Sequence, residues 1–347
     1  MQTNTTRDKI IDFIKGILIL FVILGHTTLG LIDMYSYNDT MSHITNVIYS
    51  FHMPCFIAVS GFLYREYVRN ASQDIFSRIG HKAFNILLPY VMISVIYWMI
   101  KFVLSNLLRE PVSVSSLISI PWMPIEIFWY LYALFFIYCV AYMADYVFAR
   151  LLPHFNYKME LLFVLFFIIA LTCYGRFHYE GFNYIAGFQM YFYLGCLIKK
   201  WLDKLDNRYA VLSFAVMSVM VEVSGIVLRD DISSNPLCSS LFERLIACIV
   251  TVFIFAVSYF LSGYCDFPKW VQTIGRDSMP FYAMNVIFVG GIRIILDRAG
   301  ITNMALQCVC GFAGSTGICW ILYECVIKKL RFIDFIFYPG KQLDVRK

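Results

Sequence analysis

The chain alternates long apolar stretches with short polar segments. Each apolar stretch is about 20 residues long, which is the length an α-helix needs to cross the hydrocarbon core of a bilayer. The pattern predicts about ten transmembrane helices, at 10–32, 44–64, 84–106, 124–147, 159–175, 183–199, 209–228, 241–263, 279–296 and 304–327. The connecting segments are short and show no repeat at a fixed period. The sequence therefore predicts an all-α membrane bundle, with residues 1–347 as a single integral-membrane domain that ends in a short tail at about 328–347.

Composition supports this interpretation. Hydrophobic residues make up 60% of the chain and charged residues 15%, and the mean hydropathy is +0.69. A soluble globular domain carries about a quarter charged residues to cover its surface, so this composition excludes a large soluble protein. The first apolar stretch is too long for a removed signal peptide and lacks a small-residue cleavage site, so we expect it to be the first transmembrane helix.

The orientation follows from the basic residues between the helices. Most of the 28 lysines and arginines fall in alternate loops, on one side of the predicted bundle. Cytoplasmic loops carry the excess of Lys and Arg in membrane proteins. We therefore expect both termini and the tail to be cytoplasmic, in a multi-pass protein of the cell (plasma or inner) membrane.

The eleven cysteines do not suggest a disulfide or metal framework. Most lie within or at the ends of apolar stretches, where cysteine behaves as a small hydrophobe. Only Cys238 and Cys265 fall in predicted loops, and the chain has no C-x-x-C pair. We expect packing roles for the cysteines and no bound metal.

The first predicted helix carries the strongest candidates for chemistry. Lys15 and His26 are eleven residues apart, which is about three helical turns, so they share one helix face roughly 16 Å apart along the axis. Ionisable groups inside a membrane helix are costly, and each is a functional-site hypothesis. His26 can act as a general base, or it can make a structural hydrogen bond between helices. Lys15 can contact a ligand, or it can extend toward the membrane surface.

Two further side chains are expected near the depth of His26. The predicted topology places His52 in the second helix within about one turn of that depth. Glu126 falls near the outer start of the fourth helix, at a similar or shallower level. His52 also has a structural interpretation, because Pro54 leaves a backbone carbonyl one turn earlier without its donor.

A basic cluster is predicted at the cytoplasmic side. Arg78 and Lys82 precede the third helix, and Lys15 lies near the same membrane face. Lys and Arg are the usual partners of phosphates, which makes an anionic ligand the functional interpretation. The alternative is the general excess of positive charge on the cytoplasmic side, which needs no ligand.

Two local patterns concern packing. The pair Ser60-Gly61 on the second helix is most simply a close helix–helix contact. In GRDSMP, Asp277 or Ser278 is a candidate N-cap for the helix that follows, with Met279-Pro280 in its first turn.

Six segments together resemble a known family. They are DFIKGILILFVILGH, FHMPCFIAVSGFLY, HKAFNILLPY, IFWYLYALF, MYFYLGCLIKK and TIGRDSMPFYAMN, in that order along residues 7 to about 290. The chain resembles acyltransferase family 3, the integral-membrane O-acyltransferases that modify extracytoplasmic sugars, and especially the branch of fucose 4-O-acetylases and related acetyltransferases. The resemblance implies a ten-helix membrane enzyme.

The resemblance also implies roles for particular residues. The family's first helix carries a basic residue, ten further residues and a histidine, and Lys15 and His26 match that spacing. His26 then corresponds to the catalytic histidine, and Lys15 to an arginine linked to acyl-donor binding. Lys82 matches a basic position in a segment linked to coenzyme A. Asn85 and Asn285 stand where many members carry a further basic residue and a histidine, respectively.

The favoured function is therefore transfer of an acyl group, with acetyl-CoA as the expected cytoplasmic donor and a cell-surface or lipid-linked sugar or polysaccharide as acceptor. The donor phosphates would dock at Lys15, Arg78 and Lys82. His26 would deprotonate the acceptor hydroxyl or briefly carry the acyl group. The expected partners are acyl-CoA, the acceptor and membrane lipid, and not nucleic acid.

In that interpretation His52 and Glu126 would orient His26 or bind the acceptor.

The alternative function is a transporter or flippase for a lipid-linked or charged solute, with Lys15, His26 and Glu126 as a binding or proton-relay path. Such transporters often contain repeated halves with helices broken at matching positions. Pro54, Pro89 and Pro280 show no such relation in this chain.

Overall fold

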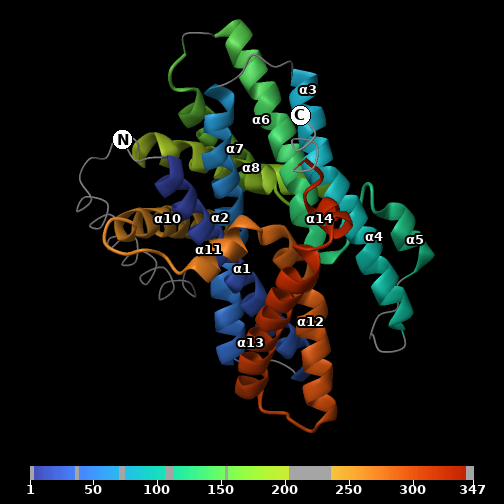
Figure 1. The fold of residues 1–347 in the computed structure, drawn as a ribbon. Coiled ribbons are helices and arrows are strands. Elements are labelled where there is room, and N and C mark those ends of the chain that lie inside the picture. The colour runs from blue at the N-terminus through green and yellow to red at the C-terminus, as the bar shows by residue number, and fades with distance from the viewer. Residues whose placement is uncertain are drawn as a thin grey trace. The chain divides into compact units, whose positions relative to one another are not determined.

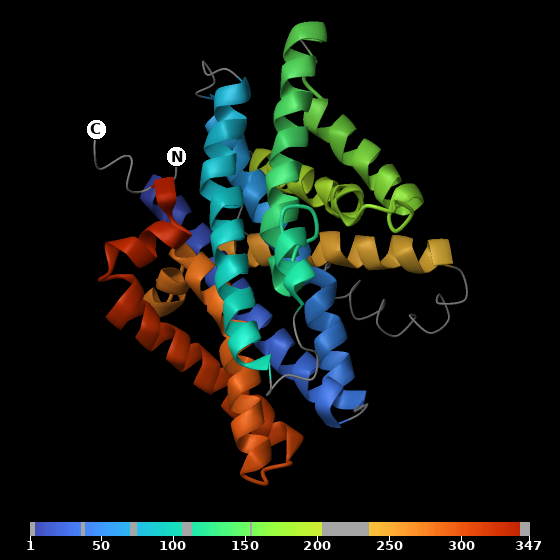
Figure 2. The same ribbon diagram turned by 90° about the vertical axis from the view of Figure 1, so that its right-hand side faces the viewer.

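The computed structural model describes residues 4–35, 39–69, 75–105, 113–152, 155–202 and 236–340, and no strand occurs among them. The chain divides into two compact units, each built from segments that are distant in sequence. The first combines Met1–Arg65 with Leu194–Cys325, and the second combines Glu66–Tyr193 with Val326–Lys347. Figures 1 and 2 show the helices of both units.

The first unit is assembled around the N-terminal helix. Its elements are α1 (Asn4–Tyr35), most of α2 (Asp39–Arg69), the last third of α8 (Glu180–Leu202), α10 (Pro236–Leu261), α11 (Lys269–Arg276), α12 (Ser278–Arg298), α13 (Met304–Leu322) and most of the π-turn η4 (Tyr323–Ile327).

The second unit contains the middle of the chain and its last helix. Its elements are α3 (Ile75–Lys82), the π-turn η1 (Ala83–Leu87), α4 (Leu88–Val103), α5 (Val114–Ser119), the 3₁₀ turn η3 (Glu126–Phe128), α6 (Trp129–Leu151), α7 (Lys158–Cys173), most of α8, and α14 (Arg331–Phe337). α3, η1 and α4 follow one another without a break and form one long rod (Figure 2).

The predicted helical class is confirmed. Helices occupy nine of the ten predicted ranges, and the remaining range, 209–228, lies outside the described residues. Seven helical stretches in the described part of the chain are long and apolar enough to cross a membrane: Lys9–Tyr35, Asp39–Tyr64, Ile75–Val103, Glu126–Leu151, Leu237–Leu261, Ser278–Arg298 and Met304–Ile327. The count of ten, the cytoplasmic termini and the single domain stay predictions. All eleven cysteines are free thiols.

α1 and α11 touch backbone to backbone. A Cβ atom at Gly275 would overlap the carbonyl oxygen of Asp12, and one at Gly16 would overlap the carbonyl oxygen of Val271. Only glycine permits this approach. Beside it, the rings of Phe13 and Phe267 stack with centroids 3.9 Å apart. The contact holds α11 against the turn of α1 that carries Lys15.

The N-cap prediction at Asp277 is wrong. Asp277 precedes α12 but makes no side-chain cap hydrogen bond. Its Oδ2 instead accepts from the Tyr323 hydroxyl at 2.7 Å and from Arg276 Nε at 3.1 Å. The carboxylate is buried, and the two donors satisfy it better than a cap would. Its hydrogen bond to Arg276, outside the membrane-spanning segments, holds the pKa of that guanidinium above its ordinary value.

The close contact predicted for the Ser60-Gly61 pair is present in the first unit. The Cys196 thiol of α8 donates to the carbonyl of Gly61 at 3.2 Å. A Cβ atom at Gly195 would overlap the Ala58 carbonyl oxygen. Ser60 itself bonds within its own helix, to the Phe56 carbonyl at 3.3 Å.

α1 also packs against α12 and α13 (Figures 1 and 2). The Arg293 guanidinium donates to the carbonyl oxygen of Gly30, where a Cβ atom would collide with it. The Tyr35 hydroxyl donates to Asp297 Oδ1 at 2.7 Å and lies 2.5 Å from Gln307 Nε2. Polar contacts therefore fix the three helices at the C-terminal end of α1.

We expect Gly275→Ala to destabilise the protein, because the added methyl group overlaps backbone that cannot move aside. The cost of such overpacking is about 1–3 kcal/mol. Thermal unfolding of the detergent-purified protein should show a lower midpoint. Gly290→Ala is the matched control, since an added Cβ atom there meets nothing within 4 Å. Equal midpoints for the two variants would contradict the backbone contact.

Candidate functional site

His26 lies on α1 with its imidazole half-buried, facing α2. Its Nδ1 is 3.2 Å from the hydroxyl of Tyr49. The Tyr49 ring makes an edge contact with the His26 ring, with centroids 6.3 Å apart, and another with the His52 ring, at 4.9 Å. The structure thus brings the two predicted histidines together around one tyrosine.

The two imidazoles have different hydrogen-bond environments. His52 is 4% exposed, and its Nδ1 lies 2.6 Å from the Ile48 carbonyl oxygen, so Nδ1 carries the proton and donates. The structural interpretation expected His52 to serve the carbonyl that Pro54 leaves without a donor. The carbonyl it contacts instead is that of Ile48, one turn before His52 on α2. At His26 the partner is a hydroxyl, which can donate or accept, so either ring nitrogen can hold the proton.

α1 and α2 are held at a fixed spacing beside this pair. A Cβ atom at Gly25 would lie 3.0 Å from the Tyr49 ring and 3.1 Å from Ile48, so glycine makes room for the tyrosine. A second contact joins the same two helices, where the buried hydroxyls of Thr28 on α1 and Thr45 on α2 lie 2.7 Å apart. The position of Tyr49 next to His26 is therefore fixed by both helices.

Lys15 belongs to the same unit as the histidines. It is half-buried on α1, next to the Gly16 position where α11 crosses. Because α1 is one unbroken helix from Asn4 to Tyr35, Lys15 and His26 are separated by three turns of regular helix, as the sequence predicts.

Arg78 and Lys82 lie in the second unit, at the start of the rod formed by α3, η1 and α4. The Arg78 guanidinium carbon is 5.8 Å from the ring centroid of Tyr142, and Lys82 Nζ is 3.8 Å from that of Tyr138. Arg78 is 8% exposed. The two cations are thus held against aromatic faces of α6.

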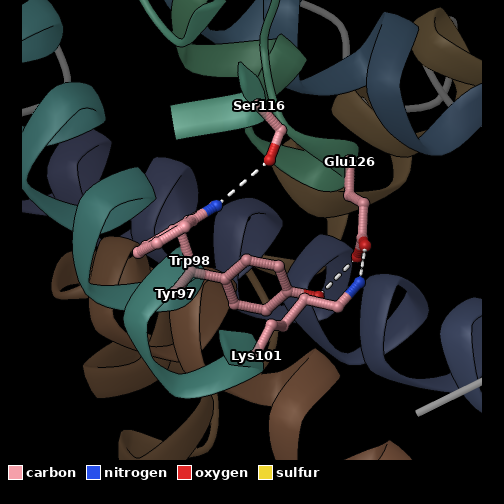
Figure 3. Close-up of polar contacts among 5 residues, drawn as sticks. All are labelled: Tyr97, Trp98, Lys101, Ser116 and Glu126. Carbon is pink, nitrogen blue, oxygen red and sulfur yellow. Dashed lines mark hydrogen bonds and ion pairs between the residues drawn. The ribbon is translucent and has the colours of Figure 1, made fainter. Parts of the chain in front are cut away.

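Glu126 also belongs to the second unit, at the entrance to α6 (Figure 3). Its carboxylate pairs with Lys101 and accepts from the buried hydroxyl of Tyr97, both from α4. One residue further on α4, the Trp98 indole donates to Ser116 Oγ at 3.0 Å and ties α5 to the same place. Glu126 is partly exposed at the edge of this cluster.

The backbone of Glu126 is strained. Its φ of 43° is the only positive value at a non-glycine residue in the described parts of the chain. The left-handed conformation costs an L-residue about 1–2 kcal/mol. Such strain collects at functional sites, where the surroundings hold a side chain in a required direction. Here the ion pair with Lys101 and the hydrogen bond from Tyr97 keep the Glu126 carboxylate in place.

The predicted site residues are therefore divided between the units. Lys15, His26 and His52 lie in the first unit, and Arg78, Lys82 and Glu126 lie in the second. The rings of His26 and His52 both contact the ring of Tyr49. The matching depth of Glu126 stays a prediction, as do the catalytic and donor-binding roles of all six residues.

The sequence alone missed the partners of these residues. Tyr49 precedes His52 by three residues and so shares its helix face, which was the available signal. Tyr97 and Lys101 are four residues apart on α4, and so are Tyr138 and Tyr142 on α6, so each of these pairs also shares a helix face. Their pairing with Glu126 and with Arg78 and Lys82 could not be predicted, because it depends on contacts between helices. Among the described residues, no group of three or more His, Cys, Asp or Glu side chains is placed to hold a metal ion.

Comparison with known proteins gives one match along nearly the whole chain. A family model described as "Acyltransferase domain" (Acyl_transf_3) matches residues 8–324. Nodulation protein NolL of Sinorhizobium fredii (strain NBRC 101917 / NGR234) is 40% identical over 84 residues, 24% of this chain and 22% of that protein. Nodulation protein NolL of Mesorhizobium japonicum (strain LMG 29417 / CECT 9101 / MAFF 303099) is 36% identical over 98 residues, 28% of this chain and 26% of that protein. The aligned segment spans about a quarter of each relative.

We expect Glu126→Gly to be more stable than Glu126→Ala. Both variants lose the carboxylate, but only glycine adopts the left-handed backbone without strain. The gain of about 1–2 kcal/mol is partly offset by about 0.4–1 kcal/mol for the more flexible unfolded chain. Thermal unfolding in detergent measures the difference. If alanine gave the more stable protein, Glu126 would not be strained.

Proposed function

Because this chain belongs to acyltransferase family 3, we propose that it is a membrane O-acyltransferase that moves an acyl group, acetyl by preference, from cytoplasmic acyl-CoA to a hydroxyl of a cell-surface or lipid-linked sugar. The resemblance inferred from the six sequence segments is confirmed by the family match. Acyl transfer is the chemistry of the family, whereas the donor, the acceptor and the residue roles belong to the proposal.

The contact between His26 and Tyr49 is the observation that carries the mechanism. When Nδ1 holds the proton and donates to the Tyr49 oxygen, Nε2 presents a lone pair and can act as a general base. Nε2 takes the proton from the acceptor hydroxyl as its oxygen attacks the thioester carbonyl. The carbon–sulfur bond then breaks, and the proton passes to the departing thiolate of coenzyme A. Tyr49 thus acts as a positioning residue that holds the imidazole by Nδ1 and leaves Nε2 for the acceptor.

Both units carry basic residues suited to the phosphates of the donor. In the first unit Lys15 shares a helix face with His26, and the roughly 16 Å between them is a length that a pantetheine arm can cover. In the second unit Arg78 and Lys82 are two cations one turn apart. Phosphate binding at Lys15 would leave the thioester end of the donor to reach His26.

The acceptor is assigned to polar groups other than the donor residues. Carboxylates accept hydrogen bonds from sugar hydroxyls, and Glu126 is partly exposed and held in place by Lys101 and Tyr97. His52 keeps Nε2 as an acceptor, because its Nδ1 donates to Ile48. We assign acceptor binding to Glu126 and support of the acceptor or of His26 to His52.

The membrane location and the partners follow from the same proposal. The apolar helices make this a multi-pass membrane protein, and we place it in the cell (plasma or inner) membrane with its donor on the cytoplasmic side. Its partners are then acyl-CoA, a sugar or polysaccharide acceptor and membrane lipid.

We expect His26→Asn to abolish turnover and Tyr49→Phe to slow it. Loss of the general base costs about 10²–10⁴-fold in rate, whereas loss of one hydrogen bond worth about 0.5–1.5 kcal/mol costs roughly 3- to 10-fold. The measurement is transfer of label from radiolabelled acetyl-CoA by the purified protein in nanodiscs, with binding of the same donor measured in parallel. Both variants should bind the donor normally. Full activity in His26→Asn would rule out the assigned base.

We expect Lys15→Ala to weaken donor binding. A charge-assisted contact with phosphate contributes about 1.5–3 kcal/mol, so the dissociation constant of acetyl-CoA should rise roughly 10- to 100-fold. Lys9→Ala is the control, because it removes an exposed cation from the same helix, and its affinity should stay near wild type. A wild-type protein that is folded and binds no acyl-CoA would overturn the donor assignment and favour the transporter function.

A further inference from the structure

Two cations of α3 lie against two tyrosines of α6. Arg78 and Lys82 are four residues apart, and so are Tyr138 and Tyr142. The pairs run in opposite directions, with Arg78 over Tyr142 and Lys82 over Tyr138. One helical turn on α3 thus matches one helical turn on α6, which gives a ladder of two cation–π contacts.

The ladder is buried. Tyr142 is 2% exposed, Tyr138 6% and Arg78 8%. A cation–π contact contributes about 0.5–1 kcal/mol at an exposed site and about 2 kcal/mol or more when desolvated. The two tyrosine rings therefore restrict the positions of the Arg78 and Lys82 cations.

Arg78 is incompletely satisfied. Its Nε is buried and has no hydrogen-bond partner among the described residues, and no ion pair to Arg78 is found there. The nearest acidic group along α6, Asp145, is paired instead with Lys158 at 2.5 Å. A buried guanidinium without a carboxylate keeps its positive charge and its donors, which is costly unless an anion completes the site.

Stacking and phosphate binding use different parts of a guanidinium. An aromatic ring can contact the flat face of a guanidinium, whereas the N–H donors project from the edge in the plane and match phosphate oxygens. The Lys82 ammonium, 3.8 Å from the ring centroid of Tyr138, has three N–H donors.

The backbone changes directly after Lys82. The π-turn Ala83–Leu87 follows, and such turns are rare and often mark functional sites. In it, Asn85 donates to the carbonyl of His81 at 2.8 Å. The turn lets α3 present its cations to α6 while α4 continues with Tyr90 and Tyr97 on its buried face.

We propose that Tyr138 and Tyr142 are positioning residues for the donor site, holding Arg78 and Lys82 by their ring faces so that the cations' N–H donors bind the phosphates of acyl-CoA. This inference rests on the proposed function and adds two residues to it. The tyrosines touch the cations and not the reacting atoms, so they determine donor affinity and leave the chemical step to His26.

The experiment compares leucine and phenylalanine at each tyrosine. Phenylalanine keeps the ring face and leucine removes it, so Tyr142→Leu and Tyr138→Leu should each raise the dissociation constant of acetyl-CoA roughly 3- to 30-fold, while the phenylalanine variants stay near wild type. Tyr146→Leu is the matched control on the same helix. It removes the ring 4.3 Å from the Arg150 guanidinium and leaves the ladder intact, so its affinity should not change.

A second probe separates phosphate binding from a general effect on the fold. S-acetyl-pantetheine keeps the thioester arm but lacks the nucleotide phosphates, so wild type and leucine variants should turn it over equally. Equal loss with both probes would mean that the tyrosines only support the fold, and unchanged acetyl-CoA affinity in the leucine variants would also overturn the proposal.

The same leucine variants distinguish a phosphate of acyl-CoA from a phosphate of a lipid headgroup. If the leucine variants lost retention of cardiolipin from mixed vesicles but bound acetyl-CoA as wild type, the ladder would hold a lipid headgroup and the proposal would be wrong. Failure of the wild type itself to bind acetyl-CoA would instead remove the proposed function, so the two failures are distinguishable.

Discussion

A polar side chain buried among apolar helices has little water to bond with, and several helices described here are joined by the partners of such side chains. Asp277 accepts from Tyr323, and Arg293 of α12 donates to the carbonyl of Gly30 on α1. Each partner reduces the cost of burial, which for an unpaired group amounts to several kcal/mol in hydrocarbon. The hydrogen bonds of these buried polar side chains therefore also join neighbouring helices.

Close packing makes these bonds possible. At Gly16, Gly275 and Gly195 two backbones approach within the space that a single Cβ atom would fill. Such approach brings side chains of one helix within hydrogen-bonding distance of carbonyls on the next. On α1 the contact with α11 lies beside Lys15, and the contact with α2 lies beside His26. The helix that carries the two principal candidates thus packs against α2, α11, α12 and α13.

The candidate site shows two ways of holding a charged or titratable group. Glu126 is held by an ion pair and a hydroxyl, which direct its carboxylate and support a strained backbone. Arg78 and Lys82 are held by ring faces, which fix position without neutralising charge. The first arrangement suits a group that must point at a neutral polyhydroxylated acceptor, and the second suits cations that must keep their charge for an anionic donor. His26, with a hydroxyl partner, keeps the freedom to change protonation that a general base needs.

The sequence by itself determined the helical class, the membrane environment, most helix positions and the family. These follow from the length and apolarity of each stretch and from short motifs, all of which are local. The three-turn spacing of Lys15 and His26 was also predictable, since one unbroken helix fixes it. Only the tertiary structure decided that Tyr49 joins His26 to His52, that Asp277 pairs with Tyr323 and does not cap α12, and that Tyr138 and Tyr142 hold Lys82 and Arg78. Those pairings join residues of different helices, and they depend on rotation and crossing of helices that no local pattern encodes.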